Sequence, residues 1–180
     1  THTTSSAASD VYKRQIQAVP SKKYKFMIIC APATLYYTKK LKVLVADKFS
    51  RAASGGVGYA KAAGNYAGQF YPTRLANDEG FDQVIWTDAN EHNYLEEAGT
   101  MNIFFRINDT LITAPTTDTI LDGVTRKSLI QIARDIGIDV EIKKLKVDEL
   151  KNAAKNGSLK EIFGAGTAAV VSQINAFQHK

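Results

Sequence analysis

Lys61 is the reactive side chain that stands out first, because it lies in a run of very small residues. Residues 55–68 read GGVGYAKAAGNYAG. Small neighbours let a flat ring approach the backbone, and a lysine amine can form a covalent link to a carbonyl carbon. The same pattern is found at many surface lysines, so other segments must decide between a reactive and a solvated lysine.

The glycines of this run also suggest a phosphate-binding loop, which would make the chain a nucleotide-binding module. The P-loop pattern requires Gly-Lys-Ser/Thr, and here Ala60 precedes Lys61 and Ala62 follows it. The dinucleotide pattern G-x-G-x-x-G fails as well, because Lys61 takes the place of its third glycine. Both patterns therefore argue against nucleotide binding.

A carboxylate is the second candidate group. Residues 95–105 read LEEAGTMNIFF, so Glu97 comes just before a strand of buried character. The alternative is that Glu96 and Glu97 are only solvent-facing charges at the edge of a strand.

Two further segments offer backbone amides to anions. Residues 123–125 (Gly-Val-Thr) open an amphipathic helix, whose free N–H groups favour a phosphate, although Gly123 could equally be a turn glycine. Residues 163–171 read FGAGTAAVV, a shape suited to a carboxylate. The amides concerned are those of Gly123, Val124, Thr125, Gly166, Thr167 and Ala168.

The elements that must position these groups follow from periodicity and turn residues. We expect strands at 24–30, 41–46, 83–87, 100–107, 111–113 and 140–147, with a glycine turn entering a β-segment over 162–174. Helices are expected from about Tyr66 to near Gly80, over 125–136 and over 147–156. Pro72 fits the first helix only in its first turn or at a kink. Strands and helices mixed with hairpins predict an α+β, or mixed α/β, domain.

Bulk composition excludes several classes of protein. The 180 residues are 44% apolar, enough for one domain with a real core. The net charge of +5 comes from scattered residues without an arginine-rich stripe, so we expect no nucleic-acid partner. No apolar run is long enough to predict a membrane span. The single cysteine, Cys30, suits a reducing cytoplasm.

The order and spacing of these segments resemble the class IV, or fold-type-IV, pyridoxal-phosphate aminotransferases. Residues 97–104 (EAGTMNIF), 111–113 (LIT) and 121–126 (LDGVTR) follow the signature of that class. The wording EAGTMN, together with GGVG-x-x-K-x-x-GNY, is specific to its branched-chain branch. The likeness spans about Tyr24 to the end.

The resemblance implies the C-terminal domain of the D-amino-acid-aminotransferase-like fold, truncated at both ends. Residues 5–15 read SSAASDVYKRQ, the translation of a sequencing-library adapter, so we expect 1–15 to be non-native or disordered. Residues 16–40 would then be the end of an N-terminal domain and a connector. Residues 41–180 would form the incomplete cofactor-binding domain.

Each candidate residue has a role implied by the resemblance. Lys61 would carry pyridoxal 5'-phosphate and move protons, and Glu97 would keep the ring nitrogen protonated. Tyr66 would bind the 3'-oxygen of the cofactor, and Arg51 its phosphate. The remaining roles are phosphate binding by Gly123, Val124 and Thr125, ring packing by Leu121 and Thr100, and substrate-carboxylate binding by Gly166, Thr167 and Ala168, with Thr167 also lining the cofactor site. No metal is implied.

The implied activity is exchange of the amino group between leucine, isoleucine or valine and 2-oxoglutarate, by a cytoplasmic homodimer of amino-acid biosynthesis. A D-amino-acid aminotransferase or an aminodeoxychorismate lyase on the same scaffold is the nearest alternative. A third hypothesis is that the 180-residue chain alone is inactive and poorly soluble, because truncation would expose apolar surface.

Overall fold

The computed structural model describes residues 20–32 and 37–180. The chain divides into two units, Thr1–Ala33 and Thr34–Lys180. Residues 20–32 contain no strand, so the predicted strand at 24–30 is wrong. Its apolar side chains are exposed, from 71% at Met27 to 89% at Phe26. A strand needs a neighbouring backbone to satisfy its N–H and C=O groups, and no described strand pairs with this segment.

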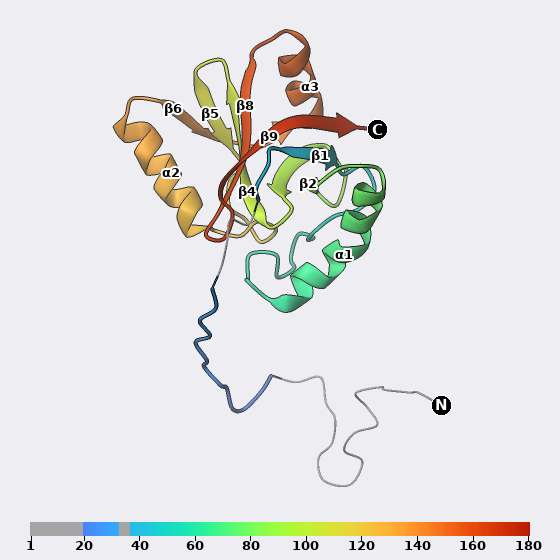
Figure 1. The fold of residues 1–180 in the computed structure, drawn as a ribbon, viewed down its shortest axis with the longest axis vertical. Helices are drawn as coiled ribbons and strands as arrows, with labels where there is room; N and C mark the ends of the chain where they lie inside the picture. The colour runs from blue at the N-terminus through green and yellow to red at the C-terminus, as the bar shows by residue number, and fades with distance from the viewer. Residues whose placement is uncertain (1–19, 33–36) are drawn as a thin grey trace. The chain divides into compact units, whose positions relative to one another are not determined.

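The second unit is built on one sheet of nine strands, in the order β6-β5-β4-β8-β9-β1-β2-β3-β7 (Figure 1). An additional pairing of β3 with β4 closes six of them, β4-β8-β9-β1-β2-β3, into a ring. The strands are β1 (Leu41–Val45), β2 (Gln83–Thr87), β3 (Tyr94–Ala98), β4 (Met101–Ile107), β5 (Thr110–Thr113), β6 (Asp139–Ile142), β7 (Leu145–Lys146), β8 (Leu159–Gly166) and β9 (Val170–His179). The presence of this sheet together with three helices in the same unit confirms the α+β fold class.

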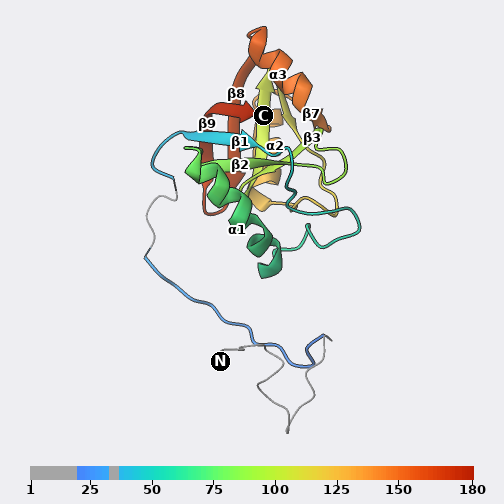
Figure 2. The same ribbon diagram turned by 90° about the vertical axis from the view of Figure 1, so that its right-hand side faces the viewer.

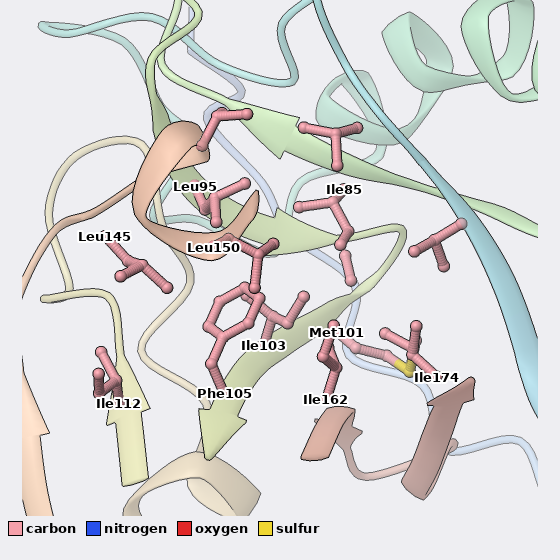
Figure 3. Packing of buried hydrophobic residues seen from close by; sticks show 14 of the residues in the cluster. Ile85, Leu95, Met101, Ile103, Phe105, Ile112, Leu145, Leu150, Ile162 and Ile174 are labelled. Atoms are coloured by element: carbon pink, nitrogen blue, oxygen red, sulfur yellow. The ribbon is translucent and has the colours of Figure 1, made fainter. Parts of the chain in front are cut away.

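Alternate side chains along β4 point to the two opposite faces of the sheet and pack into two different hydrophobic clusters. Met101, Ile103 and Phe105 are at most 2% exposed and belong to the main core cluster. Figure 3 shows Ile103 and Phe105 beside Leu150, and Met101 beside Ile174. Phe104 points to the opposite face, as the two-residue period of a strand requires, and joins a second cluster. Burying each such side chain contributes about 2 kcal/mol.

Three helices cover the sheet: α1 (Ala63–Asp78), α2 (Val124–Asp135) and α3 (Val147–Lys155). The helix α1 lies along β2 (Figure 2), where Ala76 packs into a cluster with Trp86. The helix α2 packs Ile130 into the cluster of Phe104. The helix α3 places Leu150, which is fully buried, in the main core. Among the described residues, no helix has the length and apolarity needed to cross a membrane.

Two predictions within the second unit are corrected. The single strand expected over 140–147 is two strands at opposite ends of the strand order, because β6 pairs with β5 and β7 pairs with β3. The helix expected from Tyr66 begins three residues earlier, at Ala63. Pro72 therefore lies in the interior of α1 and not in its first turn.

Candidate functional site

A cavity of about 790 Å³ joins four parts of the second unit. These are the loop that ends at Lys61 with the start of α1, the β3–β4 hairpin, the start of α2, and the turn between β8 and β9. Every residue predicted from the sequence lines it: Arg51, Lys61, Tyr66, Glu97, Thr100, Leu121, Gly123, Val124, Thr125, Gly166, Thr167 and Ala168. Segments more than 100 positions apart in the sequence thus share one space.

Glu97 is the buried acid of this cavity, with a side chain only 4% exposed. Its Oε2 lies 2.9 Å from Nε of Arg51. Its Oε1 accepts hydrogen bonds from the backbone N–H of Leu121 (2.9 Å) and from Nδ2 of Asn102 (3.1 Å). Glu96, the next residue along β3, lines a separate cavity of about 270 Å³. Glu97 is therefore not a solvent-facing charge.

Burial sets the protonation of this acid. Desolvation raises the pKa of Glu97 from 4.5 to about 7, against the opposing effects of Arg51 and of the Leu121 N–H. That value of about 7 also includes two smaller contributions, since the neighbouring Glu96 charge raises the pKa and Lys61 lowers it. A carboxyl group with this pKa gains a proton or loses one near neutrality, and a cation placed beside it would favour its ionised form.

Arg51 lies in the cavity wall, but its partners differ from the predicted one. The guanidinium group is 6% exposed and forms the ion pair with Glu97. Its Nη2 donates to the carbonyl oxygens of Gly58 (2.9 Å) and Thr119. Phosphate binding by Arg51 stays a prediction, and the contacts favour a role in holding the Glu97 carboxylate.

Lys61 and Tyr66 line another part of the cavity wall. Nζ of Lys61 lies 3.3 Å from the hydroxyl of Tyr66, and the lysine is exposed. Asn65 ties the loop to α1, since its Nδ2 donates to the carbonyl oxygens of Val57 and Ala60, both at 2.8 Å. The backbone at Lys61 is therefore held in place, whereas the exposed lysine side chain is free to move its amine within the cavity.

The start of α2 presents uncapped amides. Gly123 is the N-cap residue, no side chain caps the helix, and its first turn contains no acidic residue. The first N–H groups of a helix have no partner within it. Arg126 adds a cationic side chain in that turn, 4% exposed, and its Nη2 donates to Ala114 O. Burial lowers the pKa of Arg126, while Asp122 and Glu97 raise it. The amides of Val124 and Thr125 are thus suited to an anion.

The turn between β8 and β9 brings Gly166, Thr167 and Ala168 to the rim. Thr167 and Ala168 are exposed. Val170, which closes the turn, has a φ of +55°, a conformation that is costly for a β-branched residue. Strain of this kind persists only where the surrounding structure fixes the backbone.

Asn102 is a cavity residue that the sequence reasoning did not assign. It lies directly opposite Glu97 in the register of the β3–β4 hairpin and contacts that carboxylate. The signal was present in the sequence, because a two-residue turn at Gly99 and Thr100 pairs position 97 with position 102. Assigning Asn102 from the sequence required predicting the strand Tyr94–Ala98 first. That strand was missed because its two glutamates are typical of a solvent-exposed segment.

Comparison with known proteins identifies one family to which nearly the whole described unit is similar. The model of the family described as amino-transferase class IV matches residues 4–177. A probable branched-chain-amino-acid aminotransferase of Staphylococcus epidermidis is 45% identical over 164 residues, which are 89% of this chain and 46% of that protein.

Solved structures agree with this match. The branched-chain aminotransferase of Thermoproteus uzoniensis, crystallised with norvaline, superposes with a TM-score of 0.72 at 29% identity, covering 82% of this chain and 48% of that one. An aminotransferase from Brucella abortus bound to the cofactor PLP gives a TM-score of 0.70 at 25% identity, covering 82% and 50%. The chain spans about half the length of these relatives.

Proposed function

This chain belongs to the amino-transferase class IV family, and from that membership we propose that it forms the cofactor-binding part of a pyridoxal-phosphate-dependent branched-chain amino acid aminotransferase. The observation that carries the proposal is the single cavity in which an exposed lysine, a buried carboxylate and an uncapped helix start meet. Few ligands need an amine, an acid and an anion site together.

The residues of the cavity fit the three ends of pyridoxal phosphate. The uncapped amides of Val124 and Thr125, with Gly123 before them, suit the phosphate. Glu97 suits the ring nitrogen, because a cation at that position offsets the cost of burying its charge. Lys61 suits the carbonyl carbon, with the Tyr66 hydroxyl beside it for the ring oxygen.

Each side chain then has a distinct task. When bound, the cofactor supplies an electron sink for the charge that develops at the substrate Cα. The Lys61 amine, once free, takes a proton from Cα and returns one to the substrate or cofactor carbon. Glu97 holds the proton on the ring nitrogen, and Arg51 holds the Glu97 carboxylate in place.

The remaining cavity residues position the two ligands. Leu121 and Thr100 line the same space and are proposed to pack against the ring. The amides of Gly166, Thr167 and Ala168 are proposed to bind the substrate carboxylate, with Thr167 also lining the cofactor site.

Cofactor binding is tested by absorbance. Adding pyridoxal phosphate to the chain is expected to produce a visible band that is lost in Lys61→Ala. Lys155→Ala, at the end of α3, is the matched control because it lies outside the cavity. A band of equal intensity in Lys61→Ala would contradict the assignment of Lys61.

The proposal of branched-chain substrates rests on the names of the similar proteins and on the EAGTMN motif at residues 97–102. We propose L-leucine, L-isoleucine and L-valine as amino donors and 2-oxoglutarate as acceptor. A chimera in which this chain replaces the matching stretch of the Staphylococcus epidermidis relative supplies the remaining length. Donor profiling of that chimera should favour these three amino acids; turnover confined to D-alanine would support a D-amino-acid aminotransferase, and release of pyruvate from aminodeoxychorismate would support the lyase.

The assembled state is also a proposal. We propose a cytoplasmic homodimer for the complete protein, and an inactive state for the 180-residue chain alone, because the exposed apolar side chains of residues 24–29 need a cover. Sedimentation of the chimera is expected to give a dimer. Turnover by the isolated chain at the rate of the chimera would refute the inactive state.

A further inference from the structure

The side-chain amide of Asn102 connects two parts of the cavity. Its Nδ2 donates to Oε1 of Glu97 at 3.1 Å and to the carbonyl oxygen of Leu121 at 2.8 Å. The residue is 6% exposed. One of its partners belongs to the β3–β4 hairpin, and the other lies just before α2, nineteen residues further along the chain.

The surroundings permit only one orientation of this amide. On the nitrogen side, the carbonyl oxygen of Leu121 can only accept a hydrogen bond, and the ionised carboxylate of Glu97 also only accepts. Its Oδ1 faces Gly123, where an added Cβ would lie 2.2 Å away. A 180° flip would place two acceptors against the amide oxygen, so the direction of both hydrogen bonds is fixed.

The loop before α2 closes this network. The backbone N–H of Leu121 donates to the same Oε1 of Glu97 that Asn102 contacts. Leu121 therefore both donates to Glu97 and accepts from Asn102. The acid, the hairpin that carries it and the start of the helix form one hydrogen-bonded unit, and Gly123 leaves the room that Asn102 requires.

We propose that Asn102 is a positioning residue that fixes the Glu97 carboxylate to the start of α2, so that the acid and the phosphate-binding amides are held at one constant separation. The inference rests on the proposed function. Asn102 touches no reacting atom in this account and acts only through Glu97 and Leu121.

The test measures Glu97 directly, in the absence of cofactor. Carbon-13 NMR of the Glu97 carboxyl group gives its pKa in the chain and in Asn102→Ala and Asn102→Asp. Loss of a hydrogen bond to the ionised form raises the pKa, and a new negative charge raises it further. We therefore expect the Glu97 pKa to rise in the order wild type, Asn102→Ala, Asn102→Asp.

A control separates positioning from general stability. Thr113 lies on β5 outside the cavity, and its buried hydroxyl donates to Ile103 O. Thr113→Val should lower the unfolding midpoint, as Asn102→Ala does, yet leave the Glu97 pKa unchanged. If Asn102→Ala does not fold, Asn102→Ser, which keeps one donor, should give a smaller rise of the same sign.

Cofactor binding provides the second readout. Asn102→Ala is expected to weaken the equilibrium binding of pyridoxal phosphate about tenfold, whereas Thr113→Val should not. An unchanged Glu97 pKa in both Asn102→Ala and Asn102→Asp would overturn the inference. Absence of cofactor binding by the wild-type chain would instead contradict the proposed function, and the NMR result would still decide the role of Asn102.

Discussion

The two sides of the cavity differ in how firmly they hold their functional groups. On one side, Glu97 is almost completely buried and has three partners from three separate segments. On the other side, Lys61 is exposed, and its Nζ lies 3.3 Å from the Tyr66 hydroxyl. The first side fixes a charge, and the second leaves an amine able to move.

This difference matches what each group is proposed to do. A carboxylate that keeps one proton on a ring must not rotate or exchange with water, and low dielectric strengthens its interactions. An amine that forms and breaks a bond in each cycle must reach more than one position. Substitutions on the Glu97 side should therefore change the free energy of unfolding as well as the rate of catalysis, whereas substitutions at Lys61 should change the rate of catalysis and leave the fold intact.

The largest expected effect is a loss of catalytic activity when Glu97 is substituted. Glu97→Gln retains the shape of the side chain but not its charge. In the chimera we expect transaminase activity to fall about a thousandfold, the cost of losing a preorganised charge at a reacting group. Steady-state kinetics measure it, and a fall of less than tenfold would show that the acid is dispensable.

The next effect is a dependence of stability on pH. Because burial raises the pKa of Glu97 from 4.5 in the unfolded chain to about 7, the folded state binds the extra proton between these values. The free energy of unfolding must therefore decrease as pH rises from about 4.5 to 7, by about 3 kcal/mol, and level off above.

Urea unfolding of the wild type and Glu97→Gln at a series of pH values isolates this contribution. Carboxylates remote from position 97 titrate alike in both proteins, so the difference between their two curves reports on Glu97 and on its interaction with Glu96. The wild type should lose stability relative to the variant as pH rises. A difference that stays constant from pH 4 to 8 would contradict the burial-driven pKa.

A smaller effect is expected at the glycine that accommodates Asn102. Gly123→Ala places a methyl group against Oδ1 of Asn102 and should cost about 2 kcal/mol of unfolding free energy. Gly68→Ala is the matched control in α1, where a Cβ meets nothing within 4 Å. This control should stabilise the chain slightly, because alanine favours a helix. Equal changes in unfolding free energy for the two substitutions would show that Gly123 is not required to make room for Asn102.

The smallest effect is expected at the strained turn. Val170→Gly should stabilise the chain by about 1 kcal/mol, because glycine adopts a positive φ without steric cost and the lost side chain is mostly exposed. Thermal unfolding provides the measurement. A lower unfolding temperature in the variant would show that the Val170 side chain contributes more by packing than its backbone costs.

Local patterns predicted most of the elements, and the resemblance predicted the residues of the site. The hairpin over 100–113 and the helix near 125–136 follow from alternation and periodicity within the segment itself. The sequence motifs predicted that Lys61, Glu97 and the start of α2 belong to one site, and all of them line the cavity.

The failures have a common physical cause, which is dependence on distant partners. The run at 24–30 has strand-forming residues but pairs with no strand in the part of the chain that the structure describes, and the run at 140–147 divides because its two halves pair with different strands. Glu97 is buried because Arg51, 46 positions earlier, supplies a cation. No local pattern reveals such a pairing.

The proposed aminotransferase function depends most on the covalent role of Lys61, and borohydride trapping tests this role directly. Treating the chain with pyridoxal phosphate and then borohydride, followed by peptide mass spectrometry, should place one reduced cofactor on Lys61. The Glu97→Gln variant should give the same adduct, because the substitution leaves the Lys61 amine in place. Label spread over other lysines, with Lys61 unmodified, would contradict the account.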